Sequence, residues 1–393
     1  MVVASNGSSP LVYSNGTKVP QSTLSSDSVV NVEKGDPMIF SPYWEKMNDE
    51  CTVVIKAQEL MSYVCDENSL CFYMLPQMRD AILRIHNVVG NAVTKDNYIV
   101  LGTGSSQLYH AALYALSPSQ PPNHPINVVA AAPYYSEYPD ATEVLQSRLF
   151  KWSGDANTYN KNEPYIELVT SPNNPDGAMR TPVVKSKAQG KIIYDLAYYW
   201  PQFTPITHQL NHDLMLFTLS KSTGHAGSRI GWAIVKDIEV AKNMIKFMRL
   251  SSVGVSRESQ IRATKLLEVI CDSYQNLKSI KSELFFSHSK RLMKERWEKF
   301  KGVIEQSNVF TLVKNPIAYC NFTKETSESY PAFAWLKSAE GIKDGEKYLE
   351  KFNICTRGGE RFGVDAKYVR ISMISTDGEF NELLRRLLKV KRG

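Results

Sequence analysis

The segment SKSTGHAGSRIGWA (220–233) decides the fold, because it joins two apolar runs, DLMLFTL (213–219) and IGWAIV (230–235). Lys221 stands at the end of the first run, and Arg229 follows eight residues later, just before the second. A lysine withdrawn from water readily loses its proton and then attacks carbonyl carbons. An arginine suits phosphate through its charge and its planar fork. The segment therefore predicts a nucleophilic lysine beside an anion-binding arginine at the end of a buried strand.

Four more β-branched runs precede this segment along the chain. They are NYIVL (97–101), INVVAAA (126–132), YIELV (165–169) and KIIYD (191–195). Most of the runs are apolar on both faces, as strands buried within a parallel sheet are. The stretch SSQLYHAALYALS (105–117), after the first run, has helical character. Strands that alternate with crossover connections predict an open α/β sheet.

Downstream, the pattern changes to long helices and short strands. The chain from Glu258 to Phe300 is charged and helical in pattern. Shorter strand-like pieces follow, VFTLV (309–313), AYCNF (318–322) and YVRISMI (368–374), and then the helical stretch NELLRRLLKV (381–390). This mixture predicts a second, smaller α+β domain.

Composition excludes several classes of protein. The 393 residues are 43% hydrophobic and 22% charged, which is typical of a globular chain of two or three domains. No run approaches the roughly 18 apolar residues of a membrane span, so no membrane partner is expected. The net charge of +6 is small and its cations are interleaved with acids, so no nucleic acid is expected. The N-terminus has no signal-peptide pattern, which predicts a cytoplasmic protein. The cysteine spacing fits no zinc site, and no metal is expected.

Three further segments can join Lys221 at the carboxyl edge of the sheet, where ligands bind in open α/β folds. Residues 102–107 (GTGSSQ) lie between a strand and a helix, and suit either a phosphate or a plain capped turn. Residues 171–177 (SPNNPDG) fix a turn at a strand end, and a turn alone would explain them. Asp195 ends the run KIIYD and needs a cation or a donor, unless it caps the next segment.

Together, these features match the needs of pyridoxal 5'-phosphate. This cofactor requires a lysine that bonds its aldehyde, backbone donors and an arginine for its phosphate, and an aspartate that keeps its pyridine nitrogen protonated. Lys221, residues 102–107, Arg229 and Asp195 supply these groups, and the Asn turn adds a polar neighbour. The sequence therefore predicts pyridoxal 5'-phosphate as the cofactor.

The order of these motifs resembles the fold-type I pyridoxal-phosphate aminotransferases: a Gly-rich loop, Asn-Pro-x-Gly, Asp-x-x-Tyr, Ser-Lys, and an Arg eight residues after the Lys. More narrowly, it resembles the plant tryptophan aminotransferase-related proteins, which share a domain with the alliinases. The matching stretches include VVNVEKGDP (29–37), SPNNPDG, SKSTGHAGSRIGWA and YVRISM (368–373). The resemblance implies a fold-type I transferase, an α/β protein with a large domain built on a mostly parallel open sheet and a smaller α+β domain.

The resemblance also implies a role for each matching residue of the cofactor site. Lys221 would carry the cofactor and later transfer protons, Asp195 would pair with the pyridine nitrogen, and Asn174 and Tyr198 would hydrogen-bond the ring hydroxyl. Lys221, Asp195 and Tyr198 would thus be the catalytic residues. The phosphate and its surroundings would be bound by Ser105, Ser106, Thr218, Ser220 and Arg229.

Three more residues complete the implied site. Tyr135 would stack on the cofactor ring. Tyr63 would reach the phosphate of a neighbouring subunit, so that a homodimer would share its active sites. Arg370 would clamp the α-carboxylate of the substrate, with Asn174 beside it, because its planar fork meets a carboxylate at two points. Tyr194 stands where relatives can carry His, and it would face away from the cofactor if the strand alternates.

The implied activity is that of a cytosolic, homodimeric aminotransferase. It would transfer the amino group of L-tryptophan to a 2-oxo acid, with pyruvate expected, and yield indole-3-pyruvate in auxin biosynthesis. No second arginine is evident for a side-chain carboxylate, which counts against aspartate as the donor. The Cys-rich module and signal peptide of secreted alliinases are missing, which favours this activity over that of a cysteine-sulfoxide C–S lyase, although both share the cofactor residues. A catalytically idle homologue that binds an amino acid or a partner protein is the other alternative.

The chain would then divide into four parts. A flexible arm, rich in Ser, Asn and Gly, would span residues 1–28. Residues 29–85 would contribute to the small domain and to dimer contacts. The large cofactor-binding domain would span residues 86–290, and the small domain residues 291–393.

Overall fold

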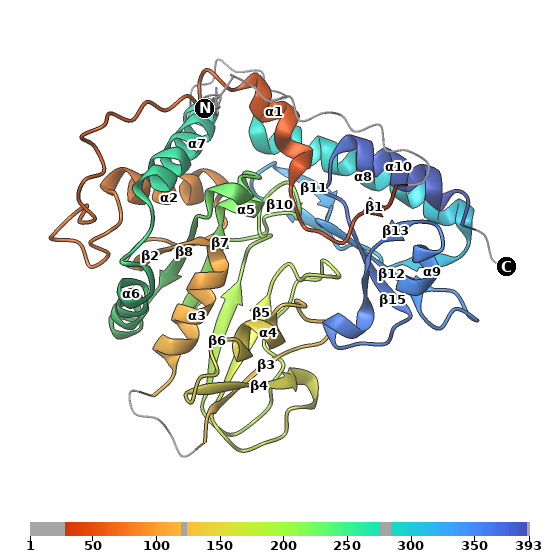
Figure 1. Cartoon of the computed structure of the whole chain (residues 1–393), viewed down its shortest axis with the longest axis horizontal. Helices are drawn as coiled ribbons and strands as arrows, with labels where there is room; N and C mark the ends of the chain where they lie inside the picture. The colour runs from red at the N-terminus through yellow and green to blue at the C-terminus, as the bar shows by residue number, and fades with distance from the viewer. Residues whose placement is uncertain (1–27, 119–123, 276–283, 391–393) are drawn as a thin grey trace, which may run out of the picture.

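A seven-stranded sheet forms the centre of the larger of the two parts seen in Figure 1, a computed structural model that describes residues 28–118, 124–275 and 284–390. The strand order is β2-β8-β7-β6-β5-β3-β4. β8 is antiparallel to both of its neighbours, and the other adjacent pairs are parallel. The strands are β2 (Tyr98–Gly102), β3 (Ile126–Ala130), β4 (Phe150–Asp155), β5 (Tyr165–Thr170), β6 (Gly190–Asp195), β7 (Leu214–Thr218) and β8 (Gly231–Val235).

This sheet confirms the predicted α/β class, and each of the six predicted runs overlaps one of its strands. β4 was not predicted. It lies at the edge of the sheet, and of its six residues Phe150 is buried while the others are partly exposed. An edge strand of this kind carries no continuous apolar run, and it therefore lacks the signal that identified the central strands.

Helices cover the sheet and pack against one another in pairs. α3 (Gly104–Leu116) packs on α6 (Ile238–Ser252), and α2 (Pro76–Val89) packs on α7 (Arg257–Gln275). Local sequence sets the helix ends. α2 begins with a proline in its first turn and ends at Gly90, whose left-handed conformation suits glycine. The Asp237 side chain caps α6 by accepting hydrogen bonds from two backbone N–H groups of its first turn.

His86, in α2, is a buried neutral histidine. The Trp232 indole can only donate, and its Nε1 donates to His86 Nε2 at 2.8 Å. The proton of the imidazole therefore sits on Nδ1, which donates to Asn91 Oδ1 at 2.8 Å. Burial lowers the pKa of His86 to about 4, and the hydrogen bond with Asn91 opposes this only in part. The neutral form of His86 therefore links α2 to β8 through its hydrogen bond with Trp232.

The smaller part is built on a four-stranded antiparallel sheet. Its order is β14-β15-β12-β9, and α8 packs on β9 and on α10, while α9 packs on β15. Two of its strands lie within predicted runs, whereas β12 was not predicted. The elements are α8 (Phe285–Ser307), β9 (Phe310–Leu312), β12 (Phe333–Ser338), α9 (Gly345–Glu350), β14 (Arg357–Gly358), β15 (Tyr368–Ser372) and α10 (Asp377–Leu387).

The first described residues belong to this smaller part. β1 (Val30–Asn31) pairs in parallel with β13 (Ile354–Cys355), and the Ser372 N–H donates to the carbonyl oxygen of Val32 at 2.8 Å. The remaining elements are short. They are α1 (Ser41–Lys46), α4 (Tyr138–Glu143), α5 (Leu219–Ser222), the hairpin of β10 (Ile317–Cys320) and β11 (Glu325–Glu328), and the 3-10 helices Met38–Phe40, Ala156–Thr158, Ala226–Ser228 and Gly359–Phe362.

The predicted domain limits can be placed on this architecture. The limit at 85/86 falls within α2, and the limit at 290/291 falls within α8. The predicted flexible arm, residues 1–28, lies outside the described residues apart from Ser28. Across the described ranges, no helix is long and apolar enough to cross a membrane, and no cluster of three or more His, Cys, Asp or Glu could hold a metal ion.

Candidate active site

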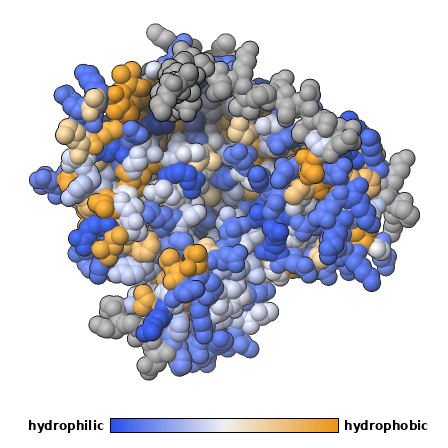
Figure 2. All heavy atoms as spheres, viewed as in Figure 1, coloured by the Kyte–Doolittle hydropathy of each residue, from blue (hydrophilic) through white to orange (hydrophobic). Residues whose placement is uncertain are grey.

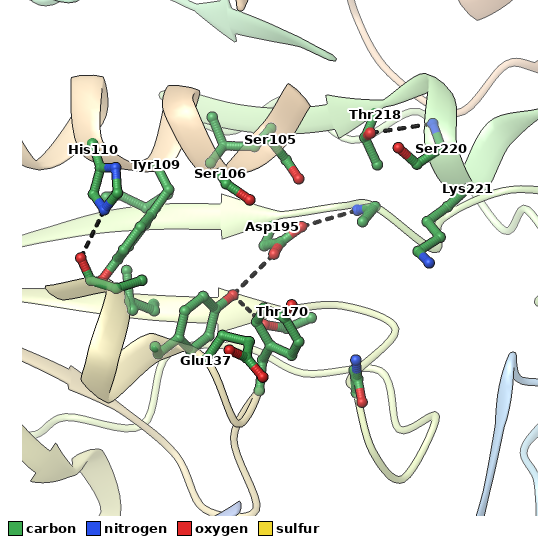
Figure 3. Close-up of a pocket in the computed structure, with 18 of the residues that line it drawn as sticks. Ser105, Ser106, Tyr109, His110, Glu137, Thr170, Asp195, Thr218, Ser220 and Lys221 are labelled. Atoms are coloured by element: carbon green, nitrogen blue, oxygen red, sulfur yellow. Dashed lines mark hydrogen bonds between the residues drawn. The ribbon is translucent and has the colours of Figure 1, made fainter. Parts of the chain in front are cut away.

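A cavity of about 580 Å³ opens at the carboxyl ends of β5, β6 and β7 (Figure 3). This is the edge where ligands bind in open α/β sheets. The cavity brings together ten of the twelve residues singled out in the sequence: Ser105, Ser106, Tyr135, Asn174, Asp195, Tyr198, Thr218, Ser220, Lys221 and Arg229. Arg370 lies at its border, and Tyr63 lies outside it.

Lys221 enters the cavity from the turn that follows β7. Thr218 ends β7 and caps α5, because its side chain accepts a hydrogen bond from the Ser220 N–H at 3.2 Å. The Lys221 ammonium donates to the carbonyl oxygen of Gly35. Burial, and then the positive charge of Arg370, lower the pKa of Lys221 to about 8. A substantial fraction of this amine is therefore neutral, and nucleophilic, near neutral pH.

Asp195 ends β6 and points into the same cavity. Its Oδ1 accepts the Ala197 N–H at 3.1 Å, and its Oδ2 accepts the Tyr138 hydroxyl at 3.0 Å (Figure 3). The same hydroxyl lies 2.7 Å from Thr170 Oγ1. Burial raises the pKa of Asp195 above its ordinary value, and the two hydrogen bonds oppose this rise. A cation in the cavity would therefore find a preorganised carboxylate.

The strand alternates as expected around Asp195. Ile193 lines the cavity with Asp195, whereas Tyr194 points to the other face and stacks on His212, with ring centroids 3.5 Å apart and planes 5° apart. The substitution of Tyr for His at this position therefore lies away from the cavity.

A candidate anion site lies where β2 passes into α3. Ser105 and Ser106 occupy the first turn of this 13-residue helix, whose N-terminus carries unpaired N–H groups. Gly104 precedes them with φ +77°, and a Cβ on it would lie 2.6 Å from Nη2 of Arg229. Arg229 is held in a left-handed conformation, and its Nη1 donates to the Ala226 carbonyl at 2.8 Å. The guanidinium thus lies against the helix N-terminus, and together they favour phosphate.

Residues 171–177 form a turn and also serve the cavity. Asn173 Nδ2 donates to the Pro133 carbonyl at 2.9 Å and to Asp176 Oδ1 at 2.8 Å, which fixes the turn. Asn174 instead lines the cavity, and its Oδ1 accepts a 3.0 Å hydrogen bond from Nη1 of Arg370. Asn173 therefore stabilises the turn, whereas Asn174 faces the cavity, so the segment serves both of the purposes that the sequence left open.

Arg370, in β15, is buried between two aromatic rings. Its guanidinium carbon lies 4.1 Å from the ring centroid of Phe333 and 5.2 Å from that of Phe362. Its Nη2 donates to the Glu33 carbonyl, while its buried Nε has no hydrogen-bond partner among the described residues. Burial, and then the nearby charge of Arg357, lower the pKa of Arg370 to about 10. A carboxylate at this border of the cavity would satisfy the guanidinium.

Two tyrosines line the cavity beside Arg370. Burial raises the pKa of Tyr198, so its hydroxyl stays protonated. Burial and the nearby Glu137 carboxylate raise the pKa of Tyr135 to about 12. The Tyr135 ring is nearly perpendicular to that of Tyr138, at 89° and 5.3 Å.

Tyr63 lies on the surface, 66% exposed, in the loop between α1 and α2. Val54 and Met61, in the same loop, are also exposed. Figure 2 shows apolar side chains at the upper left of this face, where Figure 1 places this loop and α7. The predicted contact of Tyr63 with a neighbouring subunit stays a prediction.

Sequence reasoning missed several residues of the site. Two of them are Tyr138, which donates to Asp195, and Thr170, whose hydroxyl contacts that of Tyr138. The others are the carbonyl groups of Glu33 and Gly35, which accept from Arg370 and Lys221. Glu33 and Gly35 belong to the stretch VVNVEKGDP, whose match to the family was a usable signal. Tyr138 had no such signal.

The fold is that of the fold-type I aminotransferases, the class to which the solved structures of similar fold belong. The chain is similar to an aspartate aminotransferase from Thermus thermophilus solved with maleate, with TM-score 0.65, 16% identity and 92% of each chain covered. It is also similar to an aminotransferase from Staphylococcus aureus, with TM-score 0.62, 17% identity, and 92% of this chain and 93% of that chain covered. At these identities the likeness concerns the fold alone.

The sequence comparisons narrow the class to one family. The profile of the allinase family matches residues 30–391, and the chain belongs to this family. It is 50% identical to tryptophan aminotransferase-related protein 2 of Arabidopsis thaliana over 362 residues, which are 92% of this chain and 81% of that protein. It is 36% identical to alliin lyase 1 of Allium sativum over 373 residues, 92% of this chain and 76% of that protein. The resemblance found in the sequence is thereby confirmed.

Proposed function

We propose that this protein is a pyridoxal-phosphate-dependent aminotransferase that converts L-tryptophan and a 2-oxo acid, pyruvate being the expected one, to indole-3-pyruvate and an amino acid. The observation that carries the proposal is the position of Lys221, a lysine of lowered pKa in the same cavity as the Asp195 carboxylate and the start of α3. The 50% identity to a tryptophan aminotransferase-related protein supports the choice of donor. A place in auxin biosynthesis, a cytosolic location and a homodimer with shared active sites belong to the same proposal.

The residues present fit pyridoxal phosphate. The close approach of Arg229 to Gly104 makes a cradle that a larger residue would fill, and the Asp195 carboxylate lines the same cavity, where it suits a protonated ring nitrogen. When bound, the cofactor withdraws electrons from the α-carbon of the amino acid. Ser105, Ser106 and Arg229 would bind its phosphate, and Asp195 would hold the proton at its ring nitrogen.

The remaining residues would act on the substrate and the ring hydroxyl. Arg370 would bind the α-carboxylate and so orient the α-hydrogen. Lys221 Nζ, once released, would take up the proton from the substrate Cα. Asn174 and Tyr198 would hydrogen-bond the ring hydroxyl, and Tyr135 would cover one face of the ring.

A cysteine-sulfoxide C–S lyase is the second candidate, because the alliin lyases are 36% identical over nearly the same span. Both chemistries begin with removal of the α-proton, so the cofactor residues serve either. They differ afterwards, because a lyase expels a sulfur leaving group and releases ammonia, whereas an aminotransferase passes the amino group to a second substrate.

One incubation tests the proposal. Purified protein with pyridoxal phosphate, L-tryptophan and pyruvate should form alanine and indole-3-pyruvate in equal amounts and release no ammonia. In competition assays tryptophan should rank above aspartate, with phenylalanine and tyrosine closer behind. Pyruvate and ammonia released from an S-alkyl cysteine sulfoxide would establish the lyase instead, and no turnover of either substrate would favour an idle homologue.

A further inference from the structure

A second arginine, Arg357, lies next to Arg370. The two residues pair directly across β14 and β15. Residues directly opposite in an antiparallel pair project to the same face of the sheet. Their charges interact, since Arg357 contributes to the lowered pKa of Arg370. Two neighbouring guanidinium groups would suit a substrate with two carboxylates, one for each fork.

Arg357 is, however, already bound to two carboxylates. Its Nε and Nη2 donate to Oε1 of Glu33 at 3.1 and 2.9 Å, and its Nη1 donates to Oε1 of Glu137. Nη1 also donates to Ser136 Oγ at 2.7 Å, and Arg361 Nη1 donates to Glu33 Oε1 at 3.1 Å. The two carboxylates therefore balance the two guanidinium groups of Arg357 and Arg361. We call these four charged residues the Glu33 cluster.

The cluster is enclosed on the Arg357 side and open on the Glu137 side. The side chain of Arg357 is 16% exposed, whereas that of Glu137 is 48% exposed and lines the cavity (Figure 3). Burial alone would lower the pKa of Arg357, but the hydrogen bonds that it donates to Glu137 and Glu33, together with their negative charges, outweigh burial and raise this pKa. A ligand in the cavity therefore meets the carboxylate of Glu137 first. Behind it lies the charged guanidinium of Arg357, whose donors are already hydrogen-bonded to Glu33 and Glu137.

The same cluster holds a segment that touches the reacting groups. The backbone carbonyl of Glu33 accepts from Arg370, and that of Gly35 accepts from Lys221. The side chain of Glu33 thus anchors the segment through Arg357, while its backbone carbonyl orients Arg370. Glu33 therefore links the charge balance of the cluster to the position of Arg370.

We propose that Glu33 and Glu137 determine specificity by occupying Arg357, so that the site accepts amino acids and 2-oxo acids with one carboxylate and rejects those with two. The inference rests on the proposed aminotransferase function and deepens it. A second carboxylate on the substrate would meet the like charge of Glu137 and find the fork of Arg357 already filled. Exclusion by a repulsive group is an effective source of specificity.

Binding of an unreactive dicarboxylate tests this directly. The full-length protein loaded with pyridoxal phosphate is titrated by calorimetry with maleate, and separately with indole-3-propionate, which has one carboxylate. Glu137→Gln keeps the size of the side chain and removes its charge. We expect this variant to bind maleate at least about 10-fold more tightly than the unmodified protein, which is the worth of a modest charge-assisted contact. Its affinity for indole-3-propionate should change less than about twofold on the same scale.

Two controls separate release of Arg357 from a general loss of negative charge. Asp140→Asn removes another carboxylate from the wall of the same cavity, and Asp140 is not among the residues that hydrogen-bond Arg357 in the described structure. It should not give the gain in maleate affinity. The double variant Glu137→Gln/Arg357→Gln should lose the gain. Equal gains in Glu137→Gln and Asp140→Asn, or unchanged maleate binding in Glu137→Gln, would overturn the inference.

Two further measurements keep the outcomes distinct. If Glu137→Gln does not fold, judged by its melting transition, Glu33→Gln frees the other side of Arg357 and should give the same gain. The unmodified protein is assayed in parallel with tryptophan and pyruvate. Turnover there without a gain in the variants overturns this inference alone. No turnover there overturns the proposed function, while the maleate titrations still show whether Arg357 is occupied.

Discussion

The hydroxyl of Tyr138 donates to Oδ2 of Asp195 at 3.0 Å while it lies 2.7 Å from Oγ1 of Thr170. A donor to the charged form of a carboxyl group lowers its pKa, and here it works against the burial that raises the pKa of Asp195. Tyr138 therefore helps to keep Asp195 ionised, although the two residues lie 57 positions apart in the sequence.

Tyr138→Phe should raise the pKa of Asp195 further, because the carboxylate loses one donor and gains none. Since the ionised form is the one needed at the ring nitrogen, the acid limb of the activity profile should move to higher pH. The pH dependence of kcat/KM and of the cofactor absorbance would measure this. Tyr109→Phe is the matched control, because the Tyr109 hydroxyl lies 2.5 Å from Thr142 Oγ1 instead. An unchanged acid limb in Tyr138→Phe would contradict the prediction.

Asp195→Asn should keep the fold and lose most of the turnover, roughly 100-fold or more, because a neutral amide cannot hold the ring nitrogen protonated. Single-turnover kinetics with tryptophan would measure the loss, and circular dichroism would verify the fold. The control is Asp213→Asn, whose side chain is 91% exposed. Near-normal rates in Asp195→Asn would mean that another acid performs this task.

Lys221 should capture pyridoxal phosphate with a pH dependence set by its lowered pKa of about 8. Only the neutral amine attacks an aldehyde, so the capture rate should rise with pH and level off above about 8, instead of rising to the ordinary lysine range near 10.4. Stopped-flow absorbance on protein freed of cofactor measures the rate. Borohydride reduction followed by peptide mapping should then label Lys221, and a label on Lys236 or elsewhere would refute the assignment.

Arg370→Ala should weaken the binding of tryptophan, phenylalanine and tyrosine by similar factors, about 10-fold to 100-fold, because all three share the α-carboxylate. Apparent affinities from absorbance titrations with each amino acid would test it. Arg385→Ala, on the outer face of α10, should leave them unchanged. A loss confined to tryptophan would show that Arg370 acts on the side chain.

His86 should make the fold sensitive to acid. Its pKa is about 4 in the folded protein and about 6.5 when unfolded, so the unfolded chain binds a proton that the folded protein does not between these values. The free energy of unfolding should therefore fall as pH drops below 6.5, by about 1.4 kcal/mol per unit, until about pH 4. Urea unfolding across this range should show a shallower dependence in His86→Gln. His124→Gln, at an exposed position, should keep the original slope.

The elements that could be predicted are those whose signal is local. DLMLFTL is a continuous apolar run, and the sheet buries all five residues of β7 as expected. KIIYD forms a central strand too, but of the residues of β6 only Ile193 is fully buried. The direction of β8 could not be predicted, because IGWAIV looks the same in a parallel or an antiparallel strand. β12 was not predicted because only the first four of its residues, FAWLKS, are apolar and the strand ends in a lysine and a serine.

In the candidate site, too, the residues that could be predicted are those with a local signal in the sequence. The residues that bind by their own chemistry, such as Lys221, Asp195 and Arg229, stood out by type and by position at strand ends. The residues that hold them did not, because Tyr138 reaches Asp195 across 57 positions and Glu33 reaches Arg370 across 337. Arg357 was missed for a related reason, since its place beside Arg370 depends on strand register and not on sequence spacing.

The pairing of β1 with β13 has a consequence for how the protein is made. A ribosome adds Glu33 and Gly35 long before Ile354, yet β1 pairs with β13 in the folded protein. Contacts of such long separation form late, after the local ones have closed. Until β13 has been translated, Lys221 therefore lacks the Gly35 carbonyl that orients it, and the candidate active site is completed only after that strand is made.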